Sequence, residues 1–147
     1  MTPTLGTEKP TVQDPIIKYA EEIGWNVVSQ EEALSLRKGE SGSLFYRVLE
    51  EKLLELNPGL VSRENVEDII HRMEAVRNNI EGNAEILSWL RGEQAIYDEK
   101  EKRRRNVTVV DFTCAGRNLF QVTDEWQHTN GRVTNRADIM FLINGIP

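Results

Sequence analysis

The chain has 147 residues, which fits one domain, since domains usually span about 100–200 residues. Its composition, with 39% hydrophobic and 29% charged residues and a net charge of −6, is typical of a soluble, mildly acidic folded protein and excludes collagen-like and low-complexity chains. No stretch approaches the roughly 20 apolar residues that a membrane span needs, and the polar first residues predict no signal peptide, so we expect no membrane contact.

Residues 1–11 are polar and interrupted by prolines, so we expect a flexible lead-in. Asp14 before Pro15 predicts the start of a helix, because aspartate caps helix N-termini and proline is favoured at the first helical position. Gly24 predicts its end, and the β-branched residues over 25–28 predict a brief strand.

The following part of the chain keeps helical periodicity to about residue 92. Ser29 with Glu32 forms a capping box, which predicts a helix that continues to Arg37. Apolar residues at helical spacing predict three further helices, over 44–56, from a cap at Ser62 to about Val76, and over 83–90.

From about residue 94 the periodicity becomes that of strands. Short apolar or β-branched runs predict strands over 94–98, 107–112, 118–127 and 137–143. The charged run 99–105 predicts an exposed loop or hairpin tip, and Asn130-Gly131 predicts a turn. The nearly continuous apolar run 137–143 predicts a central strand covered on both faces.

This chain order predicts an α/β or α+β fold, in which a mainly helical part (12–92) packs on a small mixed or antiparallel sheet from a mainly stranded part (94–147). Asn144-Gly145, directly after the most apolar strand, is a strong hairpin signal. A hairpin needs a returning strand, whereas the sequence stops at Pro147. We therefore expect a piece of a longer protein, cut inside a domain; a frayed terminus is the alternative.

Asp138 is an acidic residue near the start of that apolar strand. A carboxylate in such a strand is costly when buried unless it is hydrogen-bonded or binds a metal. One interpretation places it in an exposed position or pairs it with Arg136. The other makes it a Mg²⁺ ligand, because hard cations prefer oxygen ligands and Mg²⁺ often uses only one or two carboxylates.

Several segments in order resemble the N-terminal nuclease region of the R subunit of type I restriction enzymes, from about residue 8 to the end. The strongest similarity lies in the last third, where the strand over 118–122 is followed by Arg-Ala-Asp at 136–138, an apolar strand and Asn-Gly-Ile-Pro at 144–147. Weaker similarity covers three further places, at 13–25 with its Gly-Trp, at the Leu-Asn-Pro near residue 58, and at 110–112.

The resemblance implies a partial nuclease core of the PD-(D/E)xK type, with Asp138 as the catalytic and metal-binding aspartate. The Glu-x-Lys of that motif would lie on the strand after Pro147, so we expect these 147 residues to be inactive alone. The whole protein would be a hydrolase that cuts double-stranded DNA with Mg²⁺, in a complex with methylation and specificity subunits. ATP would bind only in motor domains outside these residues, because the sequence has no phosphate-binding loop.

The sequence departs from the family pattern at two positions. Ala137 stands where proline is more usual, which does not affect metal binding. Many nucleases of this fold add an acid from the first helix, and that position falls on Gln13, which brings no charge. Asp124 or Glu125 could join a metal site, although an exposed sheet edge explains them as well. Asp111 could be a structural hydrogen-bonding acid, with a metal-binding role as the alternative.

A net charge of −6 argues weakly against nucleic acid as a partner, because phosphate contacts dominate such affinity. Basic side chains nevertheless cluster locally, and local patches matter more than net charge. Candidate phosphate contacts are Lys102, Arg103, Arg104, Arg105 and Arg136. A solvated loop with self-neutralising charge, and pairing of Arg136 with nearby acids, explain the same residues without DNA.

A different class of function is also open. The helices over 12–92 could form a non-enzymatic protein-interaction module with the strands as its platform, and Asp138 would then have no function. The single cysteine, Cys114, suits a reducing cytoplasm under either interpretation, so we expect a cytoplasmic protein.

Overall fold

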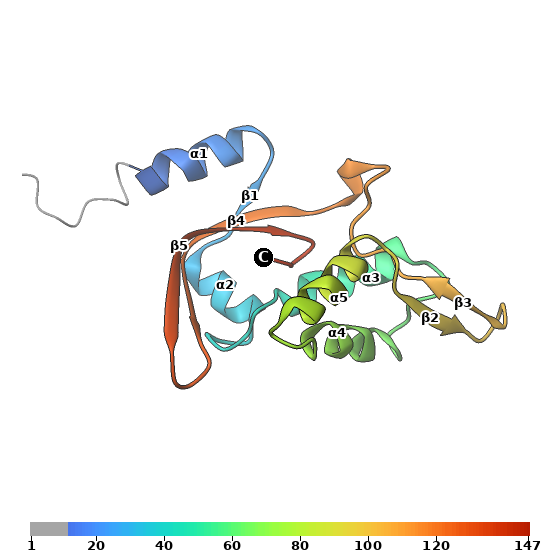
Figure 1. The fold of residues 1–147 in the computed structure, drawn as a ribbon. Coiled ribbons are helices and arrows are strands. Elements are labelled where there is room, and N and C mark those ends of the chain that lie inside the picture. Colours follow the sequence, from blue (N-terminus) through green and yellow to red (C-terminus); the bar gives the residue numbers. More distant parts are fainter. Residues whose placement is uncertain (1–11) are drawn as a thin grey trace, which may run out of the picture. The chain divides into compact units, whose positions relative to one another are not determined.

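A computed structural model describes residues 12–147, and the predicted lead-in at 1–11 lies outside the described residues. The chain forms two compact units (Figure 1). The first, called the sheet unit, combines residues 12–45 with 119–147. The second, called the insert unit, is the continuous segment Tyr46–Asn118.

The sheet unit is built on a three-stranded mixed sheet in the order β1-β4-β5. The short first strand runs parallel to the central strand, with Asn26 opposite Gln121, and the last strand pairs with the central one antiparallel. Its elements are α1 (Asp14–Glu22), β1 (Asn26–Val27), α2 (Gln30–Leu36), β4 (Phe120–Thr129) and β5 (Thr134–Ile143).

Local sequence signals explain where the helices of the sheet unit begin. Ser29 caps α2 as predicted, since its hydroxyl accepts a hydrogen bond from the Glu32 N–H at 3.2 Å, which is one of the two bonds of a capping box. At α1 the cap position is Gln13, whose side chain makes no cap hydrogen bond, and Asp14 is the first helical residue. Asp14 still favours this end, because a negative charge in the first turn complements the helix dipole.

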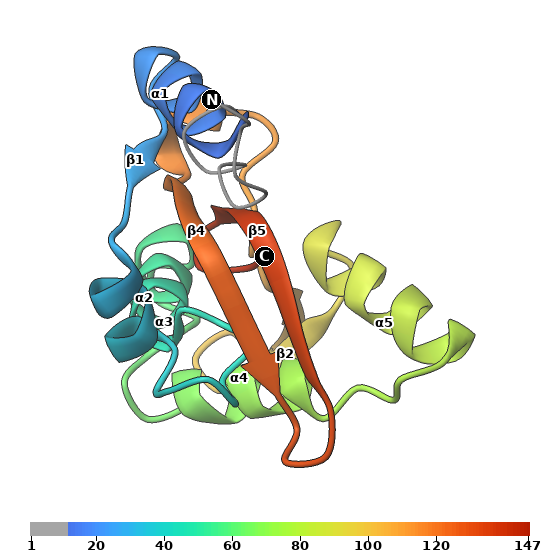
Figure 2. The same ribbon diagram turned by 90° about the vertical axis from the view of Figure 1, so that its left-hand side faces the viewer.

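The β4–β5 hairpin is the longest feature of the sheet unit. Figure 2 shows the two strands side by side, with α1 at the end opposite their connecting turn. The turn lies at Asn130-Gly131, as predicted, and the ladder runs from Thr129 opposite Thr134 to Phe120 opposite Ile143.

Among the described residues, 137–143 is not a central strand covered on both faces. The central strand is β4, and β5 lies at the edge of the three-stranded sheet. Phe141 is 42% exposed, whereas Val122 of β4 is fully buried. The order of strands is set by long-range pairing, which apolar content alone does not specify.

The predicted turn at Asn144-Gly145 is confirmed. Both residues have a positive φ, +53° and +81°, as a two-residue type I′ hairpin turn requires. Ile143 and Ile146 exchange two backbone hydrogen bonds, of 2.9 and 3.0 Å, so the chain reverses and begins to pair back on β5.

The insert unit carries helices and a small hairpin. Its buried apolar side chains include Leu49, Leu53, Ile69 and Trp89. A two-stranded antiparallel sheet pairs Ala95 with Asn106 at its open end. The elements are α3 (Tyr46–Leu56), α4 (Val66–Glu74), α5 (Ile80–Leu90), β2 (Ala95–Asp98), β3 (Arg103–Asn106) and the single 3-10 turn η2 (Ala115–Arg117).

Three boundaries in the insert unit differ from the predicted ones. Helix α5 begins at Ile80 rather than at 83, because the Asn79 side chain caps it by accepting the Gly82 N–H at 2.8 Å. At α4 the cap position is Asn65, and Ser62 instead donates its N–H to that side chain. The run 99–105 is a hairpin tip only to Lys102, since Arg103 already belongs to β3.

The strand predicted over 107–112 is absent, and this segment is irregular. Val107 and Val109 are buried as expected, but the backbone does not enter a sheet ladder. Instead the Asn57 side chain accepts the Thr108 N–H at 2.7 Å and donates to the Thr108 carbonyl at 2.8 Å. One buried amide therefore replaces both partners that a neighbouring strand would supply.

The fold class is α+β, as predicted, with five helices and small mixed and antiparallel sheets among the described residues. No helix within residues 12–147 is long and apolar enough to cross a bilayer.

Candidate functional site

Asp138 lies in the middle of β5, and its side chain is 52% exposed. It is thus a carboxylate open to solvent on the edge strand of the sheet. Asp124 pairs with Ile139 and Trp126 with Ala137, so the register places Glu125 directly opposite Asp138. The pair itself is not part of the ladder, but both carboxylates contact Arg136, at 3.4 and 3.7 Å, which brings them close together.

Glu125 has an unusual backbone conformation, with φ +50°. Residues with a Cβ rarely adopt the left-handed region, because it brings the Cβ close to the backbone carbonyl. The surrounding structure must hold such a residue in place, and conformations of this kind cluster at functional sites. The residue of β4 with the left-handed backbone, Glu125, is therefore the one at the level of the candidate aspartate.

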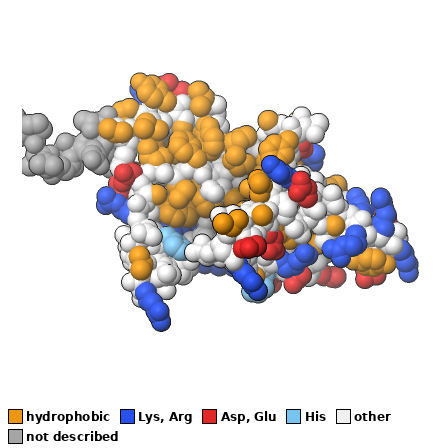
Figure 3. All heavy atoms as spheres, in the orientation of Figure 1, with side chains coloured by type: hydrophobic (Ala, Val, Ile, Leu, Met, Phe, Trp, Pro, Cys, Tyr) orange, Lys and Arg blue, Asp and Glu red, His pale blue; other side chains and the backbone are white. Residues whose placement is uncertain are grey.

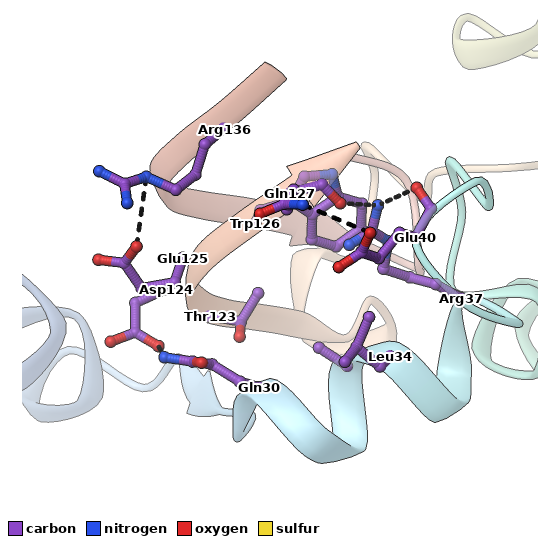
Figure 4. Close-up of a pocket in the computed structure, with 11 residues that line it drawn as sticks. Gln30, Leu34, Arg37, Glu40, Thr123, Asp124, Glu125, Trp126, Gln127 and Arg136 are labelled. Atoms are coloured by element: carbon purple, nitrogen blue, oxygen red, sulfur yellow. Dashed lines mark hydrogen bonds and ion pairs between the residues drawn. The ribbon is translucent and has the colours of Figure 1, made fainter. Parts of the chain in front are cut away.

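Arg136 lies between the two carboxylates. Its Nε atom is 3.4 Å from a Glu125 carboxylate oxygen, and its Nη2 atom is 3.7 Å from a carboxylate oxygen of Asp138. Figure 4 shows the guanidinium of Arg136 pointing toward Glu125. The alternative in which Asp138 is exposed and paired with Arg136 thus describes the geometry of this structure.

A polar cavity of about 270 Å³ opens beside this group, between α2 and β4 (Figure 4). On one wall Gln30 donates a hydrogen bond to the Asp124 carboxylate at 3.2 Å. On the other, the Thr123 hydroxyl is buried and has no hydrogen-bond partner among the described residues. Polar groups from one helix and one strand therefore converge next to Glu125.

Arg37 fixes the strand on the far side of the cavity. Its guanidinium is buried and donates to the carbonyls of Gly42, Glu40 and Gln127 at 3.0, 3.1 and 2.7 Å. It also stacks on Trp126, 3.7 Å from the ring centroid. These contacts hold the two residues that follow Glu125, and so they restrict the backbone at that position.

Gln13 is the predicted position of a possible helix-1 site residue. The structure places it at the cap of α1 in the sheet unit, where it is 5% exposed. Its Oε1 atom has no hydrogen-bond partner within residues 12–147. A buried amide oxygen without a partner is uncommon, but its role in a site stays a prediction.

The other predicted basic residues lie in the insert unit, on the β2–β3 hairpin. Figure 3 shows Lys and Arg side chains gathered over this hairpin. Lys102 is at the tip with φ +55° and is exposed, and Arg104 donates to the Ala95 carbonyl at 2.7 Å. Phosphate binding by these residues stays a prediction.

Part of that charge is neutralised within the hairpin. Arg103 pairs with Glu101 at 2.6 Å, and Arg105 pairs with Asp98 at 2.9 Å. The Arg105 guanidinium beside Asp98 holds the pKa of that carboxyl below its usual range, with hydrogen bonds from the Glu101 and Lys100 N–H groups adding to the effect. Arg105 is therefore first of all a structural partner of the hairpin.

Asp111 is a structural acid, as one of the two interpretations proposed. It accepts the N–H groups of Cys114 and Thr113 at 2.8 and 2.9 Å and pairs with Arg117 at 3.0 Å. These contacts, the Cys114 N–H foremost, lower the pKa of the Asp111 carboxyl despite its partial burial. Its lone pairs are thus used by the loop that it closes.

The residues present fit Mg²⁺ in part. No group of three or more His, Cys, Asp or Glu side chains is placed to hold a metal among the residues that the structure describes. Asp138 and Glu125 nevertheless provide two carboxylates on one face, and Mg²⁺ typically uses one or two carboxylates together with water and phosphate. The donor chemistry suits a hard cation, with Asp138 as the more accessible ligand.

The sequence left two interpretations of Glu125 open, namely a residue that joins a metal site or a residue at an exposed sheet edge. Its proximity to Asp138 depends on the register of the β4–β5 hairpin. A two-residue Asn-Gly turn would have placed Glu125 opposite Arg136, whereas the observed connection through residues 130–133 places it at the level of Asp138, so the turn signal alone did not determine this register. The left-handed backbone at Glu125 has no signal in the sequence.

Residues 6–147 match the family model described as the type I restriction enzyme R protein N terminus. No curated protein matches this sequence. The match covers the strands that carry Asp138 and Glu125 as well as the whole insert unit, in agreement with the resemblance seen in the last third of the chain. The chain therefore belongs to the family of type I restriction enzyme R protein N-termini.

Proposed function

We propose that this chain supplies the aspartate half of the nuclease site of a type I restriction R subunit, and that the full-length protein cleaves double-stranded DNA with Mg²⁺. The observation that carries the proposal is Asp138, an exposed carboxylate at the middle of an apolar edge strand. Aspartate is uncommon in strands, whereas a metal site requires an accessible carboxylate there.

Each residue of the group has a separate chemical task in this proposal. Asp138 would hold the cation, and Arg136 offers donors that can bind a phosphate oxygen. Mg²⁺, when bound, polarises the phosphate and lowers the pKa of its water. The turn at Asn144-Gly145 directs the chain back along β5, so a strand continuing from Ile146 would pass beside Asp138. That strand is where the resemblance expects Glu-x-Lys.

The remaining components are proposals of the same kind. ATP would act on motor domains of the full-length protein, and the methylation and specificity subunits would supply DNA recognition. The 147 residues alone should not cleave DNA, because they contain no Glu-x-Lys strand beside Asp138.

The test uses full-length R subunit assembled with its methylation and specificity subunits. Asp138→Asn should lower the rate of plasmid cleavage at least about a hundredfold, the order of magnitude for loss of one charge-stabilising group, while ATP hydrolysis is retained. Glu51→Gln is the control, since that exposed glutamate pairs only locally with Arg47 on α3. Cleavage by Asp138→Asn at the wild-type rate would exclude the proposal.

A second candidate function rests on an exposed apolar surface of the sheet unit. Figure 3 shows hydrophobic side chains gathered over α1. Tyr19 and Ile23 are 64% and 78% exposed, and a shallow, almost entirely apolar depression is lined by Ile16, Tyr19, Ala20, Ile23, Trp25 and Phe141. Contiguous apolar surface of this kind favours a protein-binding role.

This candidate is tested by binding of the chain to purified methylation and specificity subunits. Tyr19→Ser with Ile23→Ser should weaken that binding if α1 is the contact surface. Unchanged binding by the double variant, with wild-type helicity, would exclude it.

A further inference from the structure

We propose that Glu125 is a positioning residue for the candidate cation site: it holds Arg136 and thereby leaves the Asp138 carboxylate open to a divalent cation. The inference rests on the proposed function, since it assumes that Asp138 binds the cation. It assigns to Glu125 and Arg136 a role in regulating that binding.

The distances show that Arg136 is shared unequally. It approaches Glu125 through Nε at 3.4 Å and Asp138 through Nη2 at the longer distance of 3.7 Å. The Glu125 side chain is also less exposed than that of Asp138, 24% against 52%. Because charge pairs strengthen as solvent is excluded, Glu125 is the stronger partner of the guanidinium.

The backbone keeps Glu125 in this position. Its left-handed conformation, φ +50°, is followed directly by Trp126, on which the buried Arg37 stacks. Arg37 also binds the Gln127 carbonyl at 2.7 Å. A carboxylate carried by such a fixed backbone can hold an exposed, flexible arginine in one place.

A divalent cation and Arg136 compete for the Asp138 carboxylate, which Arg136 approaches through one oxygen. With Glu125 present, Arg136 can turn to Glu125 when the cation arrives, and the carboxylate of Asp138 is released without leaving the guanidinium unpaired. When Glu125 loses its charge, Arg136 pairs with Asp138 and opposes the cation. Glu125 thus acts on the cation through Arg136 and not as a ligand.

The experiment measures Mn²⁺ binding to the ¹⁵N-labelled 147-residue chain by paramagnetic broadening of the amide signals around Asp138. Glu125→Gln should weaken the apparent affinity about two- to fivefold, the range for an exposed charge pair. Arg136→Gln should bind at least as tightly as the wild type. The double variant should behave as Arg136→Gln does, because Glu125 has no function once the competing arginine is removed.

Two controls accompany these variants. Glu51→Gln removes a glutamate whose pair with Arg47 has a similar length, 3.3 Å, and should leave Mn²⁺ binding unchanged. Asp138→Asn should abolish the local broadening. Broadening around residue 138 that survives Asp138→Asn would exclude the proposed function itself, and the inference with it.

Two other outcomes would overturn the inference and leave the proposed function intact. If the double variant is as weak as Glu125→Gln, Glu125 binds the cation directly. If Glu125→Gln has wild-type affinity while Asp138→Asn has none, Arg136 does not compete for Asp138.

Discussion

Buried asparagine side chains hydrogen-bond segments of this chain that are far apart in sequence. Asn144 is fully buried, and its Oδ1 accepts the Leu119 N–H at 2.8 Å while its own N–H donates to the Leu119 carbonyl at the same distance. Asn57 does the same for Thr108 in the insert unit. Asn144 thus extends the pairing of β4 with β5 by one position beyond Phe120 and Ile143, whereas Asn57 serves Thr108 where no strand lies alongside.

Asn144→Ala should destabilise the sheet unit by about 2–5 kcal/mol. The variant removes the acceptor for the Leu119 N–H, which costs about 1–3 kcal/mol, and places a Cβ without a compensating amide at φ +53°, which costs about 1–2 kcal/mol. Urea unfolding followed by Trp fluorescence measures the loss. Asn144→Gly, which tolerates the backbone angle, should lose only about half as much; an equal loss would show that the backbone term is absent.

At the scale of elements, the start of α5 depends on a close approach of two backbone segments. Gly82 is the second residue after Ile80, and a Cβ at this position would lie 1.6 Å from the carbonyl oxygen of Arg77. The chain turns tightly here because the Asn79 cap draws the Gly82 N–H toward it. Glycine is required by this contact and not by its φ.

Gly82→Ala should therefore destabilise the insert unit by about 1–3 kcal/mol, the usual cost of overpacking. In an ordinary helix interior the same substitution stabilises the protein, because alanine is favoured over glycine there by about 1 kcal/mol. Thermal unfolding provides the measurement. Gly116→Ala is the matched control, since a Cβ added there would have no heavy atom within 4 Å, and it should stay within about 0.5 kcal/mol. A stabilised Gly82→Ala would contradict the close approach.

The β2–β3 hairpin should lose stability in acid. Its Asp98 carboxyl has a pKa below the usual 3.8, chiefly because it accepts a hydrogen bond from Arg105. A carboxyl whose pKa is lowered by folding stabilises the fold above its unfolded pKa, and this contribution disappears as the pH falls through the folded pKa. We expect amide exchange of β2 and β3 to accelerate below about pH 4.

The measurement is a carbon-detected NMR titration of Asp98 together with exchange rates in the hairpin. Arg105→Gln should return the pKa of Asp98 toward its usual value and remove most of the acid effect. A pKa of Asp98 that does not respond to Arg105→Gln would assign the shift to the backbone N–H groups of Lys100 and Glu101 alone.

At the scale of the whole molecule, the insert unit interrupts the sheet unit between residues 45 and 119. The two sheet-unit residues that flank the insert, Phe45 and Leu119, both bond to the turn after β5. The Phe45 N–H donates to the Gly145 carbonyl at 2.9 Å, and the Leu119 carbonyl accepts the neighbouring Asn144 N–H at 2.8 Å. The two ends therefore lie roughly 10 Å apart, a distance that a few residues can span.

Replacing residues 46–118 with a linker of about six Gly and Ser residues should leave the β4–β5 hairpin folded, since such a linker has a mean span of roughly 13 Å. Cross-strand contacts between Val122 and Phe141, detected by NMR, would show the retained register. Loss of these contacts would show that the sheet unit requires the insert unit for its stability.

Local features could be predicted from the sequence where neighbouring residues decide the structure. Ser29 caps α2, Asn130-Gly131 connects β4 to β5, and Asn144-Gly145 reverses the chain, each through contacts a few residues apart. The start of α5 at Ile80 was misplaced because the capping side chain, Asn79, was not recognised in the sequence, and the start of α4 at Val66 was misplaced because its cap position, Asn65, makes no side-chain cap bond.

The order of motifs in the sequence alone determined the family, and the match over residues 6–147 confirms it. The same motifs singled out Asp138 as the candidate site residue. Only the tertiary structure decided that β4 lies between β1 and β5, that Val107 and Val109 pack without a ladder, and that Glu125 and Asp138 both contact Arg136. The physical reason is the same in each case. Helix caps and hairpin turns depend on residues close in sequence, whereas strand order, the bond from Asn57 to Thr108 and the left-handed backbone at Glu125 depend on segments brought together by folding.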